Sequence, residues 1–412
     1  MKRLFIMLVF GAVALAASGC VKLTLAWADL SPDGVVAKPV IVDTDDISVA
    51  QWRDTLAPEI RAAFEKEIYG TLPDTRQTNV IDYRILDNRA FNGKGILSEY
   101  ELTADLTFGE RTNTTSTFYM NVVAPSTNPA APVILIETFC PRWNTIPHAG
   151  VFRPEGAGEC GSGGLMGYIF GRYITTPPIE EILDRGYAIA TIYPSEYVPD
   201  RSEAGLAALK KLSAGHTSQT TRWGAIAAWG VGFSMMVDAL DTNGFETFIA
   251  YGHSRYGKAA LVGGAFDERI DGVIAHQSGT GGASLNRLKK GESIEEITES
   301  YPHWFAPAYA TANDDGYALD IDQHHLLALI APRPILLGNA RRDVWSDPNG
   351  AFRAAIGADP VYELHGVAGL DQARLDQWTP AADIAFWIRP GTHGVVQEDW
   401  PAFLQFLDAH FK

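Results

Sequence analysis

From residue 133 onward, the chain carries six short, uninterrupted apolar runs separated by stretches with helical periodicity. The runs lie at residues 133–136, 187–192, 248–251, 273–275, 334–337 and 385–388. Continuous apolar runs of this length are typical of strands that are buried on both faces. Such strands alternating with helices predict an α/β fold with a mostly parallel sheet and helices on both of its faces.

The segment before residue 130 has a different pattern. Apolar residues recur at helical spacing from Trp52 to Phe64, which predicts one amphipathic helix before Gly70. Residues 100–108 and 118–122 alternate apolar and polar side chains around a polar stretch and predict an antiparallel hairpin. We expect the hairpin to extend the same sheet. The predicted domain therefore spans residues 46–412, with an N-terminal extension to about residue 130.

The first twenty residues have the order of a secretory leader, which is Met-Lys-Arg, an apolar run and then Ser-Gly-Cys. Cys20 after two small residues resembles a bacterial lipobox and is the predicted lipidation site, with a plain signal-peptidase cut as the alternative. We predict a signal peptide over residues 1–20 and a tether over 21–45. The exported protein would lie in the periplasm, or on the outer membrane as a lipoprotein that meets the membrane only through its anchor.

Charge and cysteine content limit the partners and the compartment. Lys and Arg number 33 against 49 Asp and Glu, for a net charge of −16. Nucleic acid is therefore not a predicted partner, because its binding needs a dense cationic face. After the leader only Cys140 and Cys160 remain. In an oxidising compartment they can form a disulfide, and two reduced, buried thiols are the alternative.

The strongest signal for chemistry follows the apolar run at 248–251 and reads Gly252-His253-Ser254-Arg255-Tyr256-Gly257. A strand that turns sharply into a helix exposes the turn residue at the carboxyl edge of the sheet, which is the geometry of a nucleophile elbow. Gly252 and Gly257 leave room for the close approach of strand and helix. The helix N-terminus adds amide donors where an oxyanion would form. Ser254 is the predicted nucleophile, and an ordinary serine in a helix-capping turn is the alternative.

A serine nucleophile needs a base, and the base needs an orienting acid, in the chain order Ser, acid, His for this kind of sheet. Asp343 follows the fifth apolar run and His393 the sixth, so both are expected where ligands bind in open α/β sheets. Asp347 competes with Asp343, but Asp347 followed by Pro348 is an efficient helix start. Asp343 is therefore the predicted acid and His393 the base, with a solvated loop histidine as the alternative.

Several motifs around these residues occur in a specific order. They read Gly-His-Ser-Arg-Tyr-Gly-Lys at 252–258, Asp-Glu-Arg at 267–269, Gln-Ser-Gly-Thr-Gly-Gly-Ala at 277–283, Gly-Glu-Ser at 291–293, Tyr-Pro-His-Trp-Phe at 301–305, Asp-Val-Trp at 343–345 and Thr-His-Gly at 392–394. Over about residues 50–412 this set resembles the glucuronoyl esterases of carbohydrate esterase family 15. The resemblance implies an α/β-hydrolase fold and a serine-type carboxylic ester hydrolase.

The resemblance also implies a substrate and roles for particular residues. The substrate would be an ester of (4-O-methyl-)D-glucuronic acid in glucuronoxylan, including its links to lignin alcohols. Ser254 would be the nucleophile, His393 the base and Arg255 an oxyanion donor. Lys258 and Glu292 would bind sugar hydroxyls, and Trp345 would form an apolar wall. The structural alternatives are a surface salt bridge for Arg255 and an exposed helix side chain for Lys258. For Glu292 the alternative is a solvated acid, and for Trp345 it is a packed core residue.

One position departs from many relatives, which place the triad acid directly before the serine of the Ser-Gly-x-Gly-Gly segment. This chain has Gln277 there, and a neutral amide cannot stabilise an imidazolium by charge. The acid role therefore falls to Asp343.

Two other functions remain as alternatives, namely an acetyl-xylan or other carbohydrate esterase, and a non-catalytic surface lipoprotein that binds carbohydrate. The predicted chemistry needs no cofactor and no metal. His324 and His325 beside Asp320 and Asp322 lack zinc spacing, and buried or capping roles are favoured. A monomer is expected.

Overall fold

The computed structural model describes residues 42–412 except 159, 161–166, 168–169, 313–315 and 317. The predicted signal peptide, Cys20 and the predicted tether up to residue 41 lie outside the described residues.

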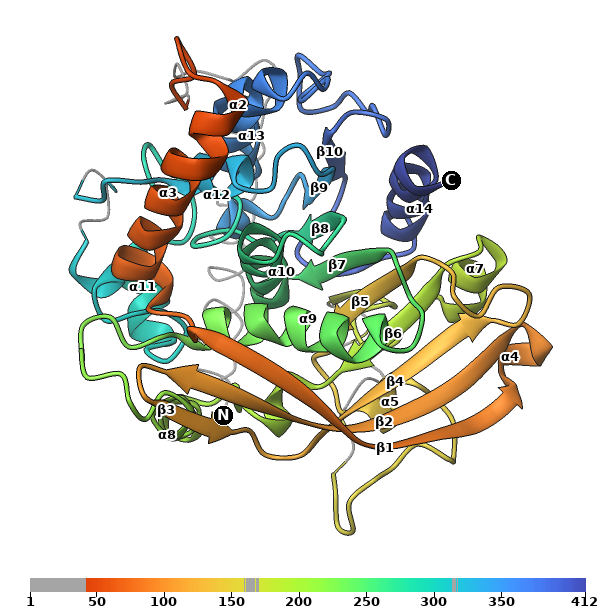
Figure 1. The fold of residues 1–412 in the computed structure, drawn as a ribbon. Coiled ribbons are helices and arrows are strands. Elements are labelled where there is room, and N and C mark those ends of the chain that lie inside the picture. The colour runs from red at the N-terminus through yellow and green to blue at the C-terminus, as the bar shows by residue number, and fades with distance from the viewer. Residues whose placement is uncertain (1–41, 159, 161–166, 168–169, 313–315, 317) are drawn as a thin grey trace, which may run out of the picture.

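One ten-stranded sheet runs through the described residues in the order β1-β2-β4-β6-β5-β7-β8-β9-β10, with β3 paired to β2 (Figure 1). The strands are β1 (Thr75–Arg89), β2 (Gly95–Phe108), β3 (Arg111–Thr114), β4 (Phe118–Pro125), β5 (Val133–Glu137), β6 (Ala188–Ile192), β7 (Phe248–His253), β8 (Gly272–His276), β9 (Ile335–Ala340) and β10 (Ile384–Arg389). Strands β5 to β10 pair in parallel, whereas β1 to β4 are antiparallel and join the parallel part where β4 meets β6.

The six apolar runs are the six parallel strands, and nearly every residue in these strands is buried. The predicted hairpin is β2 paired with β4, and it extends the same sheet as expected. The polar stretch between them is a short strand, β3, rather than a loop. The alternation analysis missed β1, because an edge strand has solvent on one side and residues 80–85 are all exposed.

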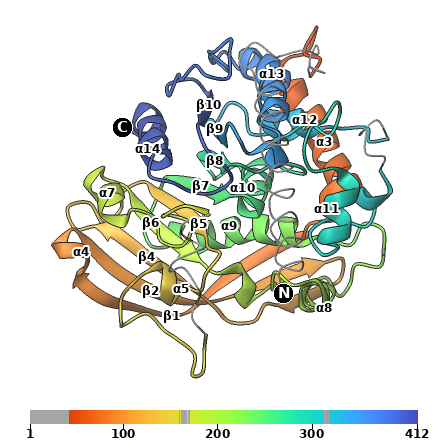
Figure 2. The ribbon, with the colours of Figure 1, turned by 180° about the vertical axis from the view of Figure 1, so that it is seen from behind.

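Helices cover both faces of the sheet (Figures 1 and 2). They are α2 (Val49–Gln51), η1 (Trp52–Leu56), α3 (Ala57–Phe64), η2 (Glu65–Tyr69), α4 (Ala90–Gly93), α5 (Arg142–Thr145), α7 (Ile179–Asp184), η3 (Pro194–Glu196), α8 (Ser202–Leu212), α9 (Ala225–Asp241), α10 (Arg255–Phe266), α11 (Ile294–Ser300), η4 (Tyr309–Thr311), α12 (Gln323–Ala328), η5 (Val344–Ser346), α13 (Pro348–Leu364) and α14 (Asp399–Phe411). Apolar residues of α9, α10, α12 and α13 form one core with the sheet, and those of α7 and α14 form a second core. This two-layer burial is what a parallel sheet requires.

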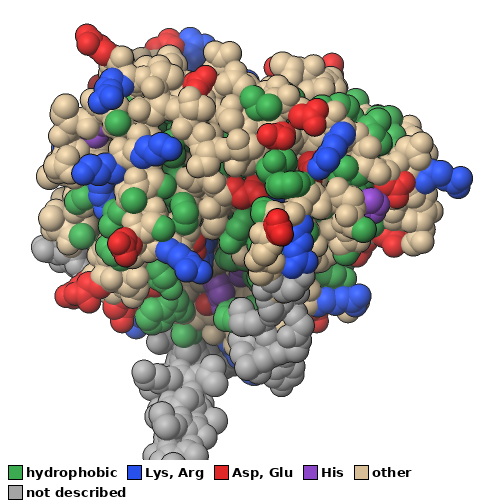
Figure 3. All heavy atoms as spheres, turned by 90° about the horizontal axis from the view of Figure 1, so that it is seen from below, with side chains coloured by type: hydrophobic (Ala, Val, Ile, Leu, Met, Phe, Trp, Pro, Cys, Tyr) green, Lys and Arg blue, Asp and Glu red, His purple; other side chains and the backbone are tan. Residues whose placement is uncertain are grey.

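The predicted helix over residues 52–64 is the middle of a longer helical segment, Val49 to Tyr69, in which two π-helical stretches interrupt the α-helix. Among the described residues, no helix is both long enough and apolar enough to cross a bilayer. On the face drawn in Figure 3, the described Lys and Arg side chains are scattered among acidic ones and form no single cationic patch.

A buried ion network fastens α5 to the antiparallel part of the sheet. The Arg142 guanidinium donates to Glu99 Oε2 at 3.1 Å, to Asn121 Oδ1 at 3.1 Å and to Glu196 Oε1 at 3.0 Å. The side chains of Arg142 and Glu99 are 0% and 1% exposed. The pair therefore gives up its hydration and depends on these partners to compensate.

Replacing Arg142 by Leu should lower the free energy of unfolding by about 3–5 kcal/mol, because it leaves the buried Glu99 carboxylate and the partly buried Glu196 carboxylate without the guanidinium that they share. Urea unfolding measures the change. Arg53→Leu, which removes an exposed ion pair with Asp54, is the matched control and should leave the stability unchanged. Equal stabilities of the two variants would show that the buried network contributes nothing.

Candidate active site

Ser254 lies at a strained turn between β7 and α10. Its φ of 56° and ψ of −123° are rarely adopted by a residue other than glycine. The turn is held because Ser254 N donates to the carbonyl of His276, in the neighbouring strand, at 2.8 Å. At Gly252 a Cβ would overlap the carbonyl of Tyr256, so glycine is required for the close approach of strand and helix. This is the geometry that the sequence predicts for a nucleophile elbow.

His393 and Asp343 form a directly hydrogen-bonded pair. His393 Nδ1 lies 2.7 Å from Asp343 Oδ2, and Asp343 is buried with 3% of its surface exposed. A carboxylate acceptor at Nδ1 holds the ring proton there and leaves Nε2 as a proton acceptor. Asp347 instead caps α13, where its Oδ1 accepts from Gly350 N at 3.0 Å. The structure thus separates the two aspartates as the sequence analysis expected.

Ser254 and His393 line the same cavity of about 290 Å³. The other lining residues are His253, Arg255, Phe139, Cys140, Cys160, Phe170, Ile174 and Thr175. The surface of the cavity is thus mainly apolar, and its polar side chains include Ser254, Arg255 and His393. A cavity of this kind binds a mostly apolar moiety while a few polar groups fix its orientation.

Arg255 lines the cavity and is held by an ion pair. Its Nη1 donates to Asp200 Oδ2, and its guanidinium carbon lies 5.0 Å from the centroid of the Trp304 ring. Asp200 Oδ1 also accepts from Trp304 Nε1 at 2.8 Å and lies 3.0 Å from His303 Nε2. These partners hold the guanidinium in the wall of the cavity that Ser254 also lines. The sequence analysis missed Asp200, because no motif marks it and its contact with Arg255 is made only by folding.

Among the predicted sugar-binding residues, Glu292 and Trp345 are in contact and Lys258 lies near enough to Glu292 to interact electrostatically, and none of the three is among the residues that line the 290 Å³ cavity. The buried ammonium of Lys258 donates to the carbonyls of Ser278 and Thr280, the latter at 2.7 Å. Glu292 N donates to the carbonyl of Trp345 at 3.1 Å, and Trp345 is 53% exposed. They therefore form a second cluster of the candidate site.

Burial dominates the ionisation of this cluster. Burial lowers the pKa of Lys258 to about 8, although the nearby Glu292 opposes the shift. Burial likewise raises the pKa of Glu292, against the effect of Lys258 and Lys289. Lys289 was not singled out by the sequence analysis, since a lysine in the pair Lys289-Lys290 looks like a solvated charge.

Beneath the serine and the histidine lies a buried polar layer. His253 Nδ1 lies 3.2 Å from His276 Nδ1, and His276 Nε2 lies 3.5 Å from Asp399 Oδ1. Burial lowers the pKa of both His253 and His276, the former well below its usual range. The His253 ring, whose centroid is 4.6 Å from that of His393, is therefore neutral and puts no second positive charge beside it.

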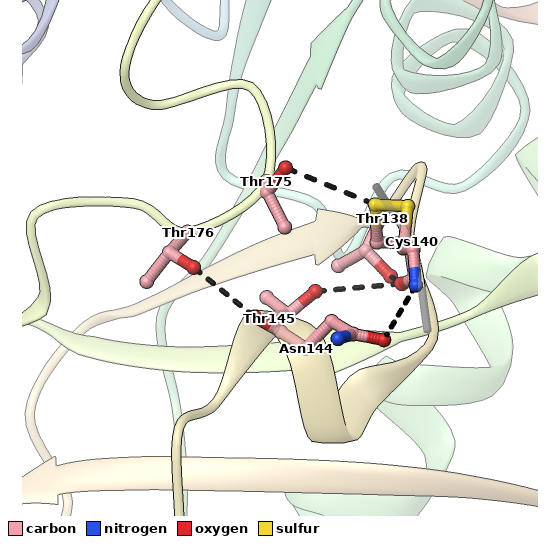
Figure 4. Close-up of a disulfide and its surroundings, with 7 residues drawn as sticks. Thr138, Cys140, Asn144, Thr145, Thr175 and Thr176 are labelled. Atoms are coloured by element: carbon pink, nitrogen blue, oxygen red, sulfur yellow. Dashed lines mark hydrogen bonds between the residues drawn. A yellow bond between two sulfur atoms is a disulfide. The ribbon is translucent and has the colours of Figure 1, made fainter. Parts of the chain in front are cut away.

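The structure joins Cys140 and Cys160 by a disulfide at the cavity wall (Figure 4). Thr138 Oγ1 donates to the Cys140 carbonyl at 2.7 Å, and Asn144 Oδ1 accepts from Cys160 N at 3.2 Å. Thr175 Oγ1 lies 3.8 Å from Cys140 Sγ. The crosslink thus ties the segment after β5 to Cys160, and both cysteines line the cavity.

Removing the crosslink in the variant Cys140→Ser/Cys160→Ser should lower the free energy of unfolding by about 3 kcal/mol. The two cysteines are 20 residues apart, and opening a loop of that length raises the chain entropy of the unfolded state accordingly. Urea unfolding measures the change. Wild-type protein unfolded in the presence of a thiol reductant should match the double variant, and a double variant as stable as the oxidised wild type would contradict the expected contribution.

Among the described residues, no group of three or more His, Cys, Asp and Glu side chains is arranged to hold a metal ion. Asp322, which the sequence analysis considered as a ligand with His324 and His325, caps α12 together with His325. The capping role favoured for this segment is confirmed.

The sheet order, the strained serine between strand and helix, and the histidine and aspartate after later strands define a serine ester hydrolase of the α/β-hydrolase fold. The chain is 33% identical over 389 residues to carbohydrate esterase MZ0003 from an unknown prokaryotic organism. The alignment covers 90% of this chain and 88% of that protein. With this degree of similarity over nearly the whole length, the chain belongs to carbohydrate esterase family 15.

Other comparisons agree with this assignment. The family model "Glucuronyl esterase, fungi" matches residues 216–366. The structure of a promiscuous CE15 esterase from a marine bacterial metagenome superposes with a TM-score of 0.76 at 31% identity, covering 91% of this chain and 96% of that one. A glucuronoyl esterase from Solibacter usitatus gives a TM-score of 0.73 at 28% identity, covering 92% and 98%. The predicted family and fold are thus confirmed.

Proposed function

We propose that this enzyme hydrolyses esters of (4-O-methyl-)D-glucuronic acid in glucuronoxylan, including esters that link the uronate to lignin alcohols. The main support for this proposal is that His393, which is hydrogen-bonded to Asp343, lines the same cavity as the strained Ser254. The buried pair of Lys258 and Glu292 supports a sugar substrate. One of the similar structures is a glucuronoyl esterase, which supports a uronate as the acyl part of the substrate ester.

In the proposed mechanism, Ser254 Oγ attacks the C6 carbonyl carbon of the uronate ester. His393 Nε2 accepts the serine proton and then donates it to the departing alcohol. Asp343 holds the proton at Nδ1 and stabilises the imidazolium that forms. Water, activated by the same histidine, then attacks the acyl-enzyme and releases the uronic acid.

Charge that develops on the carbonyl oxygen would be stabilised by Arg255 and by the first amides of α10. The guanidinium stays charged at any working pH, and its rigid donors suit a fixed oxyanion position. Asp200 and the Trp304 ring hold it in the cavity wall before substrate arrives. This preorganisation lowers the cost of orienting a long side chain during the reaction.

Lys258 and Glu292 are proposed to bind the sugar ring hydroxyls, with the exposed Trp345 indole as an apolar surface beside them. An ammonium has three donors. Two of those of Lys258 go to the carbonyls of Ser278 and Thr280, so the third can donate to a sugar hydroxyl. A carboxylate at Glu292 can accept from a neighbouring hydroxyl.

We also propose that the enzyme acts outside the cytoplasm, with Cys20 as its lipidated residue. The leader-like first twenty residues support export. The disulfide between Cys140 and Cys160 supports an oxidising compartment, where such bonds persist.

The function is tested by incubating the purified protein with benzyl and methyl glucuronate esters and, separately, with an acetylated xylan. We expect glucuronate release by the wild type and no release above background by Ser254→Ala. Asp343→Asn should lower kcat by about 10³–10⁴-fold, because an amide favours the wrong imidazole tautomer. Release of acetate alone would reject the uronate assignment in favour of an acetyl-xylan esterase, and no hydrolysis at all would favour a binding protein.

The KM for a glucuronate ester should rise as the pH increases through about 8, the pKa of the buried Lys258 ammonium. Below that pH the ammonium is charged and can bind the sugar; above it, the neutral amine is a weaker donor. Initial rates at pH 6.5 to 9.5, corrected for spontaneous hydrolysis, measure the change. In Lys258→Met, which keeps the length without the charge, KM should be higher throughout and should lose the inflection. A flat wild-type profile would contradict a role for this charge.

A further inference from the structure

The segment that carries His393 has no regular secondary structure. It follows β10 directly, and Gly394 has a φ of 149°. Its conformation is therefore set by what it contacts rather than by a helix or strand of its own. On its C-terminal side, Val395 N donates to the Phe170 carbonyl at 2.8 Å, and the Val395 carbonyl accepts from Tyr173 N at 3.0 Å.

The side chain of Gln277 contacts both of the residues that flank His393. Its Oε1 accepts from Gly394 N at 2.8 Å, and its Nε2 donates to the Thr392 carbonyl at 3.4 Å. Gln277 is 1% exposed, so both ends of its amide exchange water for these peptide groups. The side chain thus brackets His393 by hydrogen bonds to the residue before it and the residue after it.

Gln277 is itself firmly placed at the carboxyl end of β8. Its φ of 49° is unusual for a residue other than glycine, and its N donates to the Gly338 carbonyl of β9 at 2.7 Å. Its carbonyl lies 3.4 Å from Ser346 Oγ, which is also 3.4 Å from His393 Nδ1. The strain at this position is tolerated only because the surrounding hydrogen bonds fix it.

The peptide of Gly394 is held from the other side as well. Arg389 Nη2 donates to the Gly394 carbonyl at 2.8 Å, and Arg389 Nε donates to Asp399 Oδ1 at 2.8 Å. Both polar groups of Gly394 therefore have buried partners, one from the residue that follows β8 and one from the last residue of β10. The side chain that follows β8, that of Gln277, is the one that also contacts residue 392.

An amide suits this position better than a carboxylate does. It accepts from the Gly394 N–H and at the same time donates to the Thr392 carbonyl, whereas an ionised carboxylate only accepts and would face that carbonyl with like partial charge. We propose that Gln277 is a positioning residue, which fixes the His393 segment so that the imidazole stays paired with Asp343 at the cavity that Ser254 also lines. The proposal rests on the proposed function in that it takes His393 to be the catalytic base.

The test compares Gln277→Leu and Gln277→Glu with the wild type by kcat and KM. Leucine keeps much of the volume and loses both hydrogen bonds, so kcat should fall by about 10²-fold, the usual effect of a displacement of about 1 Å at a reacting group. KM should change less than about twofold, because the side-chain hydrogen bonds of Gln277 go to Thr392 and Gly394 rather than to a proposed sugar-binding residue. Glutamate keeps the acceptor for Gly394 N–H, so its kcat should lie between those of the leucine variant and the wild type.

Gln372→Leu is the matched control. The buried Gln372 amide also brackets a loop, since its Nε2 donates to the carbonyls of Arg374 and Gln377 and its Oε1 accepts from Phe386 N. At a temperature where both leucine variants are fully folded by circular dichroism, only Gln277→Leu should lose kcat. A wild-type kcat in Gln277→Leu, or equal losses in the two variants, would overturn the proposal.

Two substrates distinguish a failure of the positioning role of Gln277 from a failure of the proposed function. Each variant is assayed on a glucuronate benzyl ester and on 4-nitrophenyl acetate, a general ester that needs the same base. If the wild type cleaves only the acetate, the uronate function fails while the kcat ratio on the acetate still tests Gln277. Loss of kcat on whichever ester the wild type cleaves supports the positioning role.

Discussion

The parallel pairing of β7, β8, β9 and β10 is the constraint on which the site depends. Parallel neighbours all end at one edge of the sheet, so four segments that are distant in the chain leave it side by side. Those segments carry Ser254, Gln277, Asp343 and His393, in the same order as their strands. The hydrogen bond of 2.7 Å between His393 and Asp343 joins the last two of these segments and completes the arrangement.

The site contains strained backbone and buried polar groups that lower the stability of the fold. The protein tolerates them because the two hydrophobic cores around the site are large. Ser254 and Gln277 both have positive φ, each typically costing about 1–3 kcal/mol, at the ends of neighbouring strands. A layer of buried polar groups, including His253 and His276, lies next to His393 and the Ser254 turn instead of apolar packing. Burial also moves Lys258 and Glu292 toward their neutral forms. These features trade stability for a fixed, partly desolvated geometry.

Much of the fold could be predicted because its signals are local. Each parallel strand is a continuous apolar run, and the serine lies between glycines that leave room for the close approach of strand and helix. The rest could not be predicted for equally physical reasons. Strand β1 has no buried face that would impose alternation, and Asp200 is recognisable only through the guanidinium that it meets in the fold. Gln277 reads in the sequence as a missing acid, whereas in the structure its amide hydrogen-bonds the two residues that flank His393.

The sequence by itself determined the α/β class, the sharp turn at Ser254, the capping role of Asp347, and the family to which the chain is similar. Each of these follows from side-chain pattern within a few residues or from the order of motifs along the chain. Only the tertiary structure decided which residue holds Arg255, what Gln277 contacts, and that burial shifts the pKa values of Lys258 and Glu292. Those properties depend on distances between segments far apart in the sequence, and electrostatic and hydrogen-bond energies change steeply with such distances.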